Sequence, residues 1–598
     1  MSFNTNLAER LETIARLLEV TGANRFRVNA FTKAARSASN ETHDLSTLDR
    51  EALLAIDGIG KGVADKIDEL RDSGGIAELD ELLAEVPAGV LDLMDIPGLG
   101  PKTVRLLWQE KSITDRDGLK RIIDDGSIMD LPRMGKKTAE NIEKALTFTS
   151  KSSSRLPIGV AWPIAERVLE TLRSIEGVRR AEAAGSLRRG QETIGDLDFL
   201  VVADDPEPVR EAFCTMEGVT DVVARGDSKC SVRSTITADS GRWNVTKDLE
   251  GGGLGMDLRL VPAESFGAAL MYFTGSKDHN VRLRERAIKR GLTLNEYGLF
   301  PDEPGEGSPQ SRGIDPVAGE TEGAVFAELE MPWLPPEVRQ DAGELSLNET
   351  PQLVDVGDIR AELHAHTTAS DGRLSLDELV RGAVDRGFHT IAVTDHSRSS
   401  VQANGLSVER LRAQRDEIEA ARERSGDGIA IMAGSEVDIL ADGSLDYDDD
   451  ILAELDVVVA SPHAALTQDP KTATKRLLKA IEHPMVHVLG HPTGRLVNRR
   501  PGLEPAMDEL IAAAVEHRVA LEINSHWMRL DLRDSHVRAA VDAGCLIAID
   551  CDVHAAGDFD NIRFGVMTGR RGWLPPELCV NTWDRDRLHE WLRSKGRG

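Results

Sequence analysis

Histidines are concentrated in the carboxy-terminal part of the chain, where they recur at one position relative to short apolar runs. Thirteen of the fifteen histidines lie after residue 357, and several of these runs end directly on a histidine or a carboxylate. Predicted helices separate the runs. Strands that alternate with helices form a parallel sheet, and polar residues at the carboxyl ends of such strands meet on one face of a barrel. The pattern therefore predicts a parallel β/α barrel with a polar site on that face.

Nine polar residues stand at or near the ends of these runs, which is too many for a single ion. Imidazole together with carboxylate suits zinc, manganese or iron. A single histidine of this kind would be ordinary in a protein core, whereas six histidines and three carboxylates in one pattern indicate metal binding. The nine candidate ligands are His364, His366, Asp371, His396, Glu436, His463, His491, Asp552 and His554.

A second pattern, in the middle of the chain, places a glycine-serine turn before closely spaced carboxylates. Two of the carboxylates are separated by one residue and share a face of a predicted strand, because side chains alternate along a strand. Three carboxylates on neighbouring strands can hold two divalent ions, and arginine forks suit a triphosphate. The turn residues are Gly185, Ser186, Arg188 and Arg189, and the carboxylates are Asp196, Asp198 and Asp257.

This middle segment resembles the palm of family X DNA polymerases, the polymerase beta relatives within the nucleotidyltransferase superfamily. The resemblance implies that Asp196, Asp198 and Asp257 bind two Mg²⁺ or Mn²⁺ ions, with Asp257 helping to deprotonate the primer 3′-hydroxyl. It implies that Ser186 and Arg189 hold the triphosphate. The full set of implied nucleotide-binding residues is Gly185, Ser186, Arg189, Tyr272 and Phe273 at the sugar, Gly275, and Asn280 and Arg284 at the nascent base pair.

The region after residue 357 resembles the PHP (polymerase and histidinol phosphatase) domain, whose distorted barrel holds a trinuclear metal cluster. All nine ligand positions of that family are filled here. The resemblance implies about three Mn²⁺, Zn²⁺ or Fe²⁺ ions and metal-dependent hydrolysis of a phosphodiester or phosphomonoester. Arg495, four residues past His491, is predicted to clamp a substrate phosphate.

Three related glycine turns precede helices in the first 150 residues, at positions 56–60, 96–100 and 131–135. The free N–H groups at the start of a helix can hold a phosphate without reading base sequence. The turns resemble helix-hairpin-helix motifs, the third being degenerate because Arg133 replaces a glycine. The resemblance implies contacts to the DNA backbone at Gly58, Gly60, Gly98, Gly100 and Gly135.

Lys66 occupies the position of a lysine that, in the small amino-terminal domain of this family, removes a 5′-deoxyribose phosphate through a Schiff base. That role needs cationic neighbours, for which Lys33 and Lys61 are candidates. The tyrosine of the family's lyase pocket is replaced by Phe31, and a further lysine by Gly62. Two interpretations therefore stay open: a lyase nucleophile, or an exposed helix lysine that contacts a phosphate.

The composition describes an acidic protein with a formal net charge of −29. Such a charge opposes general nucleic-acid binding, so DNA contacts must come from local basic sites. Only 18 of the 72 basic residues are lysines, which indicates a salt-adapted or GC-rich source. Five cysteines without paired spacing, no apolar run of membrane-spanning length and no signal-peptide pattern predict a cytoplasmic protein that does not enter a membrane.

These patterns predict a multidomain α and α/β protein. The predicted regions are a small helical DNA-binding and lyase-like domain (1–80), a helix-hairpin-helix, fingers-like domain (81–150), a nucleotidyltransferase palm (155–262), a thumb-like nucleotide-selection subdomain (263–337), a linker (338–357) and a PHP metal-dependent phosphoesterase domain (358–598).

The resulting functional hypothesis is a monomeric DNA-directed DNA polymerase that fills gaps during base-excision or break repair and processes 3′ ends through a 3′-5′ exonuclease in its PHP domain. Its substrates would be gapped or primer-template DNA and deoxynucleoside triphosphates. One alternative is a DNA-binding scaffold with a vestigial polymerase, in which only the PHP phosphoesterase is active. Another is a small-molecule phosphatase of the histidinol-phosphate type, against which the helix-hairpin-helix motifs argue.

Overall fold

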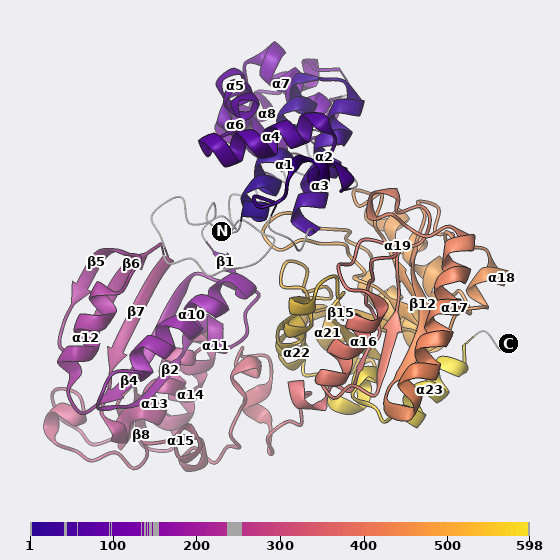
Figure 1. Ribbon diagram of the computed structural model, residues 1–598. Coiled ribbons are helices and arrows are strands. Elements are labelled where there is room, and N and C mark those ends of the chain that lie inside the picture. The colour runs from indigo at the N-terminus through magenta and orange to yellow at the C-terminus, as the bar shows by residue number, and fades with distance from the viewer. Residues whose placement is uncertain are drawn as a thin grey trace. The chain divides into compact units, whose positions relative to one another are not determined.

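The computed structural model describes two compact units, Met1–Ser152 with Asn498–Pro501, and Ser153–Val497 with Gly502–Gly598 (Figure 1). None of the helices in the described ranges combines the length and apolar character that a membrane span requires. The described residues are 3–40, 45–56, 58–94, 96, 99–132, 134–136, 139, 142, 146, 155–235 and 254–595.

The first unit is helical, as the repeated glycine turns predict. Leu7, Leu11, Ile14 and Leu18 recur at helical spacing along the first helix and are buried on one face. The helices are α1 (Phe3–Thr21), α2 (Arg25–Asn40), α3 (Arg50–Ala55), α4 (Lys61–Ser73), α5 (Ala77–Glu85), α6 (Ala88–Met94), α7 (Pro101–Lys111) and α8 (Arg116–Asp124), followed by a 3₁₀ turn, η1 (Ser127–Asp130).

The second unit begins with a five-stranded mixed sheet in the order β2-β4-β7-β6-β5. Strands β4 and β7 are parallel neighbours at its centre, and the remaining pairs are antiparallel. The elements are β1 (Leu156–Pro157), α10 (Ile158–Arg173), β2 (Val178–Ala183), α11 (Gly185–Arg188), β3 (Thr193–Ile194), β4 (Asp196–Ala203), α12 (Pro206–Thr215), β5 (Val219–Arg225), β6 (Lys229–Ser234) and β7 (Leu254–Leu260).

Strand β4 sends alternate side chains to two different cores. Leu197 and Phe199 are fully buried in the cluster that includes α10 and α12. Leu200 and Val202 are buried in a smaller cluster with α13 (Phe266–Thr274). Because Asp198 has the same parity as Leu200, its carboxylate lies on the face that α13 covers, away from the larger core.

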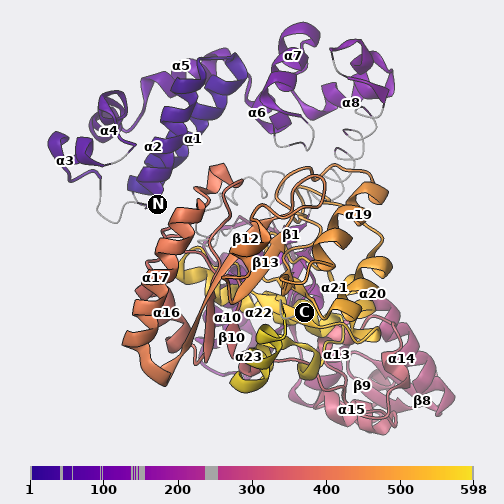
Figure 2. The ribbon, with the colours of Figure 1, turned by 90° about the vertical axis from the view of Figure 1, so that its right-hand side faces the viewer.

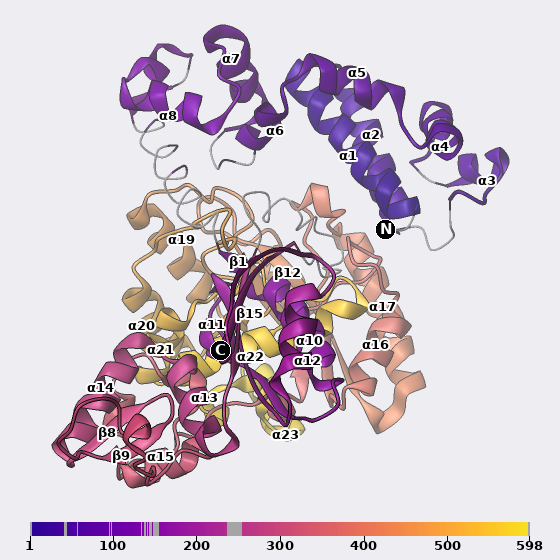
Figure 3. The ribbon, with the colours of Figure 1, turned by 90° about the vertical axis from the view of Figure 1, so that its left-hand side faces the viewer.

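The segment that follows the sheet forms a small α/β subdomain beside α13 (Figure 3). Its core gathers Leu283, Leu299, Phe326 and Leu334, all fully buried. Its remaining elements are η3 (Ala263–Ser265), α14 (Lys277–Lys289), β8 (Leu292–Asn295), β9 (Gly298–Pro301), η4 (Gln310–Arg312) and α15 (Glu322–Glu328).

The stretch predicted as a linker, residues 338–357, is packed against its neighbours rather than exposed throughout. Arg339 is fully buried and pairs with Glu322, with Nη1 2.7 Å from Oε1. Glu344 is fully buried and lies 2.7 Å from His279 Nδ1. The acidic composition suggested solvent exposure, but each of these charges has a buried partner of opposite or titratable character. Three short 3₁₀ turns occur here: η5 (Pro336–Val338), η6 (Glu344–Ser346) and η7 (Val356–Asp358).

The carboxy-terminal region confirms the predicted barrel: seven parallel strands in sequential order from β10 to β16. Ala365 and Val553, just past the ends of the first and last strands, form an isolated parallel bridge, so the sheet is nearly closed. Helices α16, α17, α19 and α20 lie outside the strands (Figure 2). The strands are β10 (Ala361–Glu362), β11 (Thr390–Val393), β12 (Ala430–Asp438), β13 (Val457–Ser461), β14 (Val488–Leu489), β15 (Ala520–Asn524) and β16 (Ile547–Asp550).

The barrel helices are amphipathic, and several begin at capping residues. Ser375, for example, accepts from the backbone N–H of Glu378, whose carboxylate accepts in return from the N–H of Ser375. The helices are α16 (Leu376–Asp385), α17 (Val408–Ser425), α18 (Asp449–Leu452), α19 (Pro470–Ile481), α20 (Met507–His517), α21 (Asp534–Asp542), α22 (Ile562–Arg571) and α23 (Arg585–Arg593), with 3₁₀ turns η8 (Val401–Ala403), η9 (Gly426–Gly428), η10 (Ala556–Asn561), η11 (Pro576–Leu578) and η12 (Val580–Thr582).

Candidate active sites of the palm and the barrel

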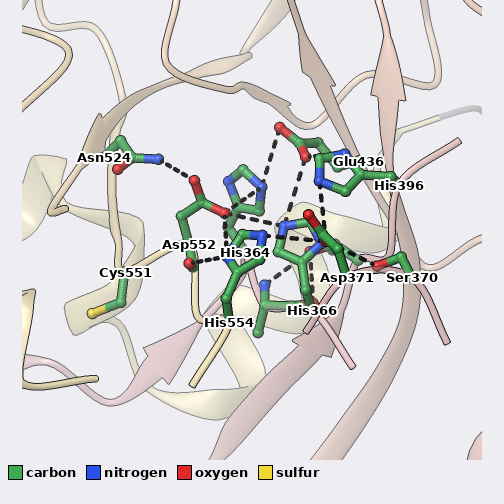
Figure 4. Close-up of polar contacts among 12 residues, drawn as sticks. His364, His366, Ser370, Asp371, His396, Glu436, Asn524, Cys551, Asp552 and His554 are labelled. Carbon is green, nitrogen blue, oxygen red and sulfur yellow. Dashed lines mark hydrogen bonds and ion pairs between the residues drawn. The ribbon is translucent and has the colours of Figure 1, made fainter. Parts of the chain in front are cut away.

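The predicted barrel ligands come together at the carboxyl ends of the strands. In Figure 4 the labelled imidazoles and carboxylates of the cluster point toward one another, while Cys551 points away. Each comes from a strand end or the loop beyond it, as parallel topology requires. His364, His366 and Asp371 follow β10, His396 follows β11, Glu436 lies in β12, His463 follows β13, His491 follows β14, and Asp552 and His554 follow β16.

Glu436 is the carboxylate that most of these histidines share. One of its oxygens, Oε1, lies 2.9 Å from His491 Nε2 and 3.1 Å from His463 Nε2. The other, Oε2, lies 2.9 Å from His396 Nδ1. Glu436 is almost fully buried, so its charge needs these partners or a cation.

Eight of the nine predicted ligands fall into three overlapping groups, as expected for a multinuclear centre, and His491 lies beside Glu436 outside these groups. His366 joins two groups, one with Asp552 and the other with Asp371. His364 belongs only to the former. The sequence pattern also predicts that His364 and His366 share one metal with Asp371 and His554; in the structure His364 is grouped with His366 and Asp552, whereas Asp371 and His554 are grouped with His366 and His396. The groups are His364, His366 and Asp552; His366, Asp371, His396 and His554; and His396, Glu436 and His463.

Protons occupy part of this cluster when cations are absent. Burial lowers the pKa of His463, but Glu436 and Asp438 beside it raise that pKa to about 10. Burial likewise lowers the pKa of His554, and Asp552 and Asp371 raise it to about 9. Metal ligation requires neutral imidazole, so we expect metal binding to release protons and to weaken as the pH falls.

The donor set fits divalent metals. Among the described residues, several buried ring nitrogens of the cluster have no hydrogen-bond partner, including both nitrogens of His366, Nε2 of His364 and Nδ1 of His491. Oδ1 of Asp552 is also buried without a hydrogen-bond partner among the described residues. Buried polar atoms are rarely left unpaired, and ligation by metal ions would account for them.

Two further carboxylates, which the sequence pattern did not identify, orient ligand histidines. Glu522 in β15 lies 2.6 Å from His364 Nδ1, and Asp438 in β12 lies 2.5 Å from His463 Nδ1. Carboxylates in this position fix the tautomer of a metal-binding histidine. Each carboxylate could have been found in the sequence as a charged residue inside an otherwise apolar strand. Asp438 stands two residues after Glu436, and Glu522 stands two residues before Asn524.

Arg495 is placed differently from the prediction. Its side chain is 5% exposed and its Nη2 lies 2.7 Å from Oε2 of Glu192, in the palm. It also donates to the carbonyl of Leu530. A guanidinium with these buried partners does not face the metal cluster as a phosphate clamp.

In the palm, the central strands bring two predicted carboxylates opposite each other. Asp198 of β4 is in register with Asp257 of β7, and Asp196 is at the exposed start of β4. Burial raises the pKa of Asp198 to about 6, with Asp196 and Asp257 adding to the effect. Asp257 is engaged by Lys229, 2.7 Å away, and by the hydroxyl of Ser231 at 2.6 Å.

The palm carboxylates are less tightly gathered than the barrel ligands. They are not among the groups of described residues whose ligand atoms lie within 4.8 Å of one another. Cations between Asp196, Asp198 and Asp257 would neutralise the repulsion that raises the pKa of Asp198.

Gly185 brings the turn that is predicted to bind phosphate close to Asp198. Its φ is +63°, and a Cβ atom there would lie 2.3 Å from Asp198 Oδ2, so only glycine fits. Arg189 is half-buried and donates to the carbonyl of Thr274. Arg188, which the sequence suggested as a second triphosphate donor, instead pairs with Glu322, at 2.7 Å.

The predicted nucleotide-selection residues form a connected group on α13 and α14. Tyr272 and Phe273 are half-buried and pack edge to face, with ring centroids 5.1 Å apart. Asn280 donates to the carbonyl of Tyr272 at 2.6 Å, and half-buried Arg284 lies one helical turn further along α14. Gly275 has a φ of +69°, and a Cβ atom there would lie 3.2 Å from Arg189 Nη1. Ser186 is half-buried in α11.

The glycines of the amino-terminal motifs separate into two kinds. Gly60 and Gly100 precede α4 and α7 without a side-chain cap, and a Cβ atom at either, or at Gly135, would meet nothing within 4 Å. These positions leave room for a phosphate to approach the backbone. Gly58 has a φ of +91° and packs against Ser37 and Lys33 instead. Gly98 lies outside the described residues.

Lys66 lies on α4 between two carboxylates. Its Nζ is 3.3 Å from Glu69 Oε2 and 3.3 Å from Glu78 Oε2, and its side chain is 20% exposed. Glu78 also pairs with Arg27. The lysine therefore belongs to an ion-pair network with Glu69, Glu78 and, through Glu78, Arg27.

Four family models match parts of the chain: a helix-hairpin-helix domain (residues 2–76), a SAM-like helix-hairpin-helix tandem (90–146), the DNA polymerase beta thumb (269–340) and the PHP domain (362–526). The amino-terminal matches confirm the predicted helix-hairpin-helix motifs.

Known relatives cover the chain in full and in part. The DNA polymerase/3′-5′ exonuclease PolX of Bacillus subtilis (strain 168) is 37% identical over 572 residues, 96% of each chain. DNA polymerase lambda of Rattus norvegicus is 26% identical over 356 residues, 56% of each. A probable phosphatase of Thermoanaerobacter sp. (strain X514) is 27% identical over 248 residues, 40% of this chain and 95% of the relative.

Proposed function

Because the chain belongs to the family X DNA polymerases that carry a PHP domain, we propose that it adds nucleotides to DNA 3′ ends in the palm and removes them in the barrel. The observation that carries the polymerase assignment is the register of Asp198 with Asp257, beside the Gly185 turn. This arrangement puts carboxylates and a backbone turn that can approach phosphate in one place.

In the palm, Asp196, Asp198 and Asp257 would hold two divalent ions, Mg²⁺ or Mn²⁺, which lower the cost of the charge that develops at the transferring phosphate. Asp257, which accepts from the hydroxyl of Ser231, would take the proton of the primer 3′-hydroxyl. Ser186 and Arg189 would bind the triphosphate of the incoming nucleotide from the adjacent turn.

The sugar and base of the incoming nucleotide would lie against the neighbouring helices. Tyr272 and Phe273 would line the sugar pocket, with Gly275 beside them. Asn280 and Arg284 would face the base pair, which requires Asn280 to exchange its bond to the Tyr272 carbonyl for a contact with substrate.

In the barrel, the nine ligands would hold about three ions, Mn²⁺, Zn²⁺ or Fe²⁺, which activate water for attack on a phosphodiester. Glu522 and Asp438 keep His364 and His463 turned toward the cluster.

The substrates are DNA and deoxynucleoside triphosphates. Gly60, Gly100 and Gly135 would contact the DNA backbone, with Gly58 shaping its turn and Gly98 assigned from the motif alone; a monomeric, cytoplasmic state stays a prediction.

The test is a pair of assays on one preparation. With Mg²⁺ and four deoxynucleoside triphosphates, we expect extension of a primer across a short gap by the nucleotides that the template specifies. With Mn²⁺ and no nucleotides, we expect stepwise shortening of a labelled 3′ end. A preparation that shortens DNA but never extends it would support the scaffold alternative.

One observation favours that alternative, in which only the barrel is active. Lys229 already pairs with Asp257, so a cation must displace this lysine before Asp257 can serve as a ligand. The pair is 39% and 27% exposed, however, and exposed ion pairs contribute only about 0–1 kcal/mol. Displacement by a divalent ion is therefore inexpensive, and the polymerase assignment stands.

Lys66 provides a separate prediction. Because its amine is held between Glu69 and Glu78, we expect borohydride to trap little or no covalent adduct with the unmutated protein on an incised abasic duplex. Glu78→Gln would release one ion pair and serves as the comparison. Efficient trapping by the unmutated protein, lost in Lys66→Ala, would contradict this and establish the lysine as the nucleophile.

A further inference from the structure

The large hydrophobic core of the palm includes side chains from the barrel. Trp527 and Leu530, in the loop after β15, and Phe564, on α22, are buried in the same cluster as Ile158 and Leu197 of the palm. All five are at most 8% exposed. The palm sheet and the barrel therefore share one core, and neither surface would be covered without the other.

A glycine makes this contact close. The backbone of Gly159 in α10 lies against the indole of Trp527, and a Cβ atom there would be 2.1 Å from Trp527 Cγ. Trp162, one turn along α10, packs edge to face on Phe564 with centroids 6.4 Å apart. The helix that begins the palm is thus seated directly on the barrel loop.

Polar groups of the barrel hold the turn that separates the triphosphate-binding residues from the palm carboxylates. Glu192 lies between Arg189 and Asp196 in sequence, and its partner Arg495 is buried and also donates to the carbonyl of Leu530. Two residues earlier, the carbonyl of Gly190 accepts from Arg571 Nη1 at 2.6 Å. Both ends of the three-residue turn 190–192 are therefore bonded to barrel arginines.

These two arginines are themselves fixed. Arg571 is 7% exposed as a residue and also pairs with Asp534. Gly190 has a φ of +63°, and a Cβ atom there would lie 2.9 Å from Met567 Cβ on α22. Burial raises the pKa of Glu192, but the opposite effect of Arg495 and Arg571 is larger. The pKa is therefore lowered on balance, and the carboxylate is charged at neutral pH. The turn is held by a pre-formed basic site made of two largely buried arginines.

The loop that carries Arg495 also carries a predicted metal ligand. His491 stands four residues before Arg495, and the intervening Thr493 bonds through its N–H and its hydroxyl to Asp531, at 3.0 and 2.9 Å. The same barrel loops thus border the metal cluster on one side and support the palm turn on the other.

We propose that Arg495 is a positioning residue for nucleotide addition, which acts through Glu192 to hold the turn between Arg189 and Asp196. The barrel is then a structural part of the polymerase site, in addition to carrying its own chemistry. Arg495 touches neither the nucleotide nor the metals. This inference rests on the proposed polymerase function.

The experiment is a double-mutant cycle on the full-length protein with Arg495→Gln, Glu192→Gln and both together. We expect each single variant to lower kcat/KM for nucleotide addition about 2- to 30-fold, the range found for residues that couple sites without touching ligand. Most of the change should be in KM for the nucleotide, because the displaced turn flanks Arg189. The double variant should be no slower than the slower single variant, and Arg495→Lys should restore part of the loss.

The matched control is Arg563→Gln, which removes the 3.4 Å pair with Glu166 across the same interface but away from the turn. It should extend primers like the unmutated protein. The thermal unfolding midpoint of each variant is measured as well. A variant that keeps its midpoint but loses activity has a misplaced turn, whereas a lowered midpoint indicates misfolding. Should Arg495→Gln fail to fold, Glu192→Gln carries the test, since that side chain is 32% exposed and the change preserves its shape.

Two outcomes overturn the inference: single variants whose nucleotide KM matches that of Arg563→Gln, or losses that add in the double variant. Both would leave the polymerase function intact. Failure of the unmutated protein to extend any primer would instead remove the proposed function, so the two failures are distinguishable.

Discussion

Asp198→Ala should abolish templated nucleotide addition while the same preparation still shortens DNA 3′ ends. Among the palm carboxylates in residues 155–235 and 254–262, Asp198 alone combines partial burial, register with Asp257 and contact with the Gly185 turn. Its removal leaves two separated carboxylates, of which Asp257 stays bound to Lys229. We expect the extension rate to fall about 1,000-fold, the scale on which loss of one charge-stabilising group acts in an enzyme.

Asp221→Ala is the matched control for this variant. Asp221 is an exposed carboxylate on β5, at the far edge of the same sheet. Rates are compared on a one-nucleotide gap and on a labelled 3′ end, with protein from parallel purifications. Extension by Asp198→Ala at the rate of the control would remove the palm assignment.

The same carboxylate makes the metal-free protein sensitive to pH. The folded-state pKa of Asp198 is raised from 3.8 to about 6, so between these values the unfolded chain has lost a proton that the folded chain keeps. The free energy of unfolding therefore falls as the pH rises through this window, by at most about 3 kcal/mol. Chemical denaturation with a chelator present should show this fall, and Asp198→Asn or added Mg²⁺ should remove it.

The sequence predicted the fold and the chemistry more completely than it predicted the partners of charged residues. The barrel was predicted from the alternation of apolar runs with helices. Its candidate ligands were predicted from their positions at the ends of those runs, because parallel strands bring these ends together. The helix-hairpin-helix motifs could be predicted equally well from their glycine turns. Each of these depends on a local pattern that fixes where a side chain must point.

Arginines were harder to place, because a sequence gives their charge but not their partner. Arg188 and Arg495 were both predicted to face phosphates, yet the first binds Glu322 and the second binds Glu192. Both partners lie far away in sequence. Arg339, in the predicted linker, is buried because it pairs with Glu322. The sequence alone does not show this pairing. Charge neutralisation within the core decided all three positions.

The metal cluster provides the second large effect, at His364. This histidine is fully buried, with Nε2 3.3 Å from Glu436 and 3.7 Å from Asp552, and Glu522 holds its other nitrogen at 2.6 Å. His364→Ala removes a ligand and takes away the imidazole partner of buried Glu522, which keeps its bond from the N–H of His491. Since even the residues that orient a ligand are worth about 10- to 100-fold, we expect 3′ shortening to fall by at least about 100-fold and bound metal to drop.

Templated extension should survive in His364→Ala, because the bonds between Arg495 and Glu192 and between Arg571 and Gly190 do not involve this histidine. His483→Ala is the matched control, since His483 is a barrel histidine outside the cluster, paired with Asp449 at 3.2 Å and accepting from the N–H of Met485 at 3.3 Å. EDTA should stop both activities of the unmutated protein. Added Mn²⁺ should restore both, whereas Mg²⁺ should favour extension because it enters imidazole-rich sites reluctantly.

The decisive quantity is the rate of 3′ shortening per protein for His364→Ala and His483→Ala purified identically, with metal content measured on the same samples. A loss of metal together with the nuclease, and with extension retained, places the chemistry in the barrel. Equal nuclease rates in the two variants would mean that the activity comes from elsewhere. The cluster would then be structural, and its loss should appear as a lower unfolding midpoint instead, because metals that bind only the folded state stabilise it.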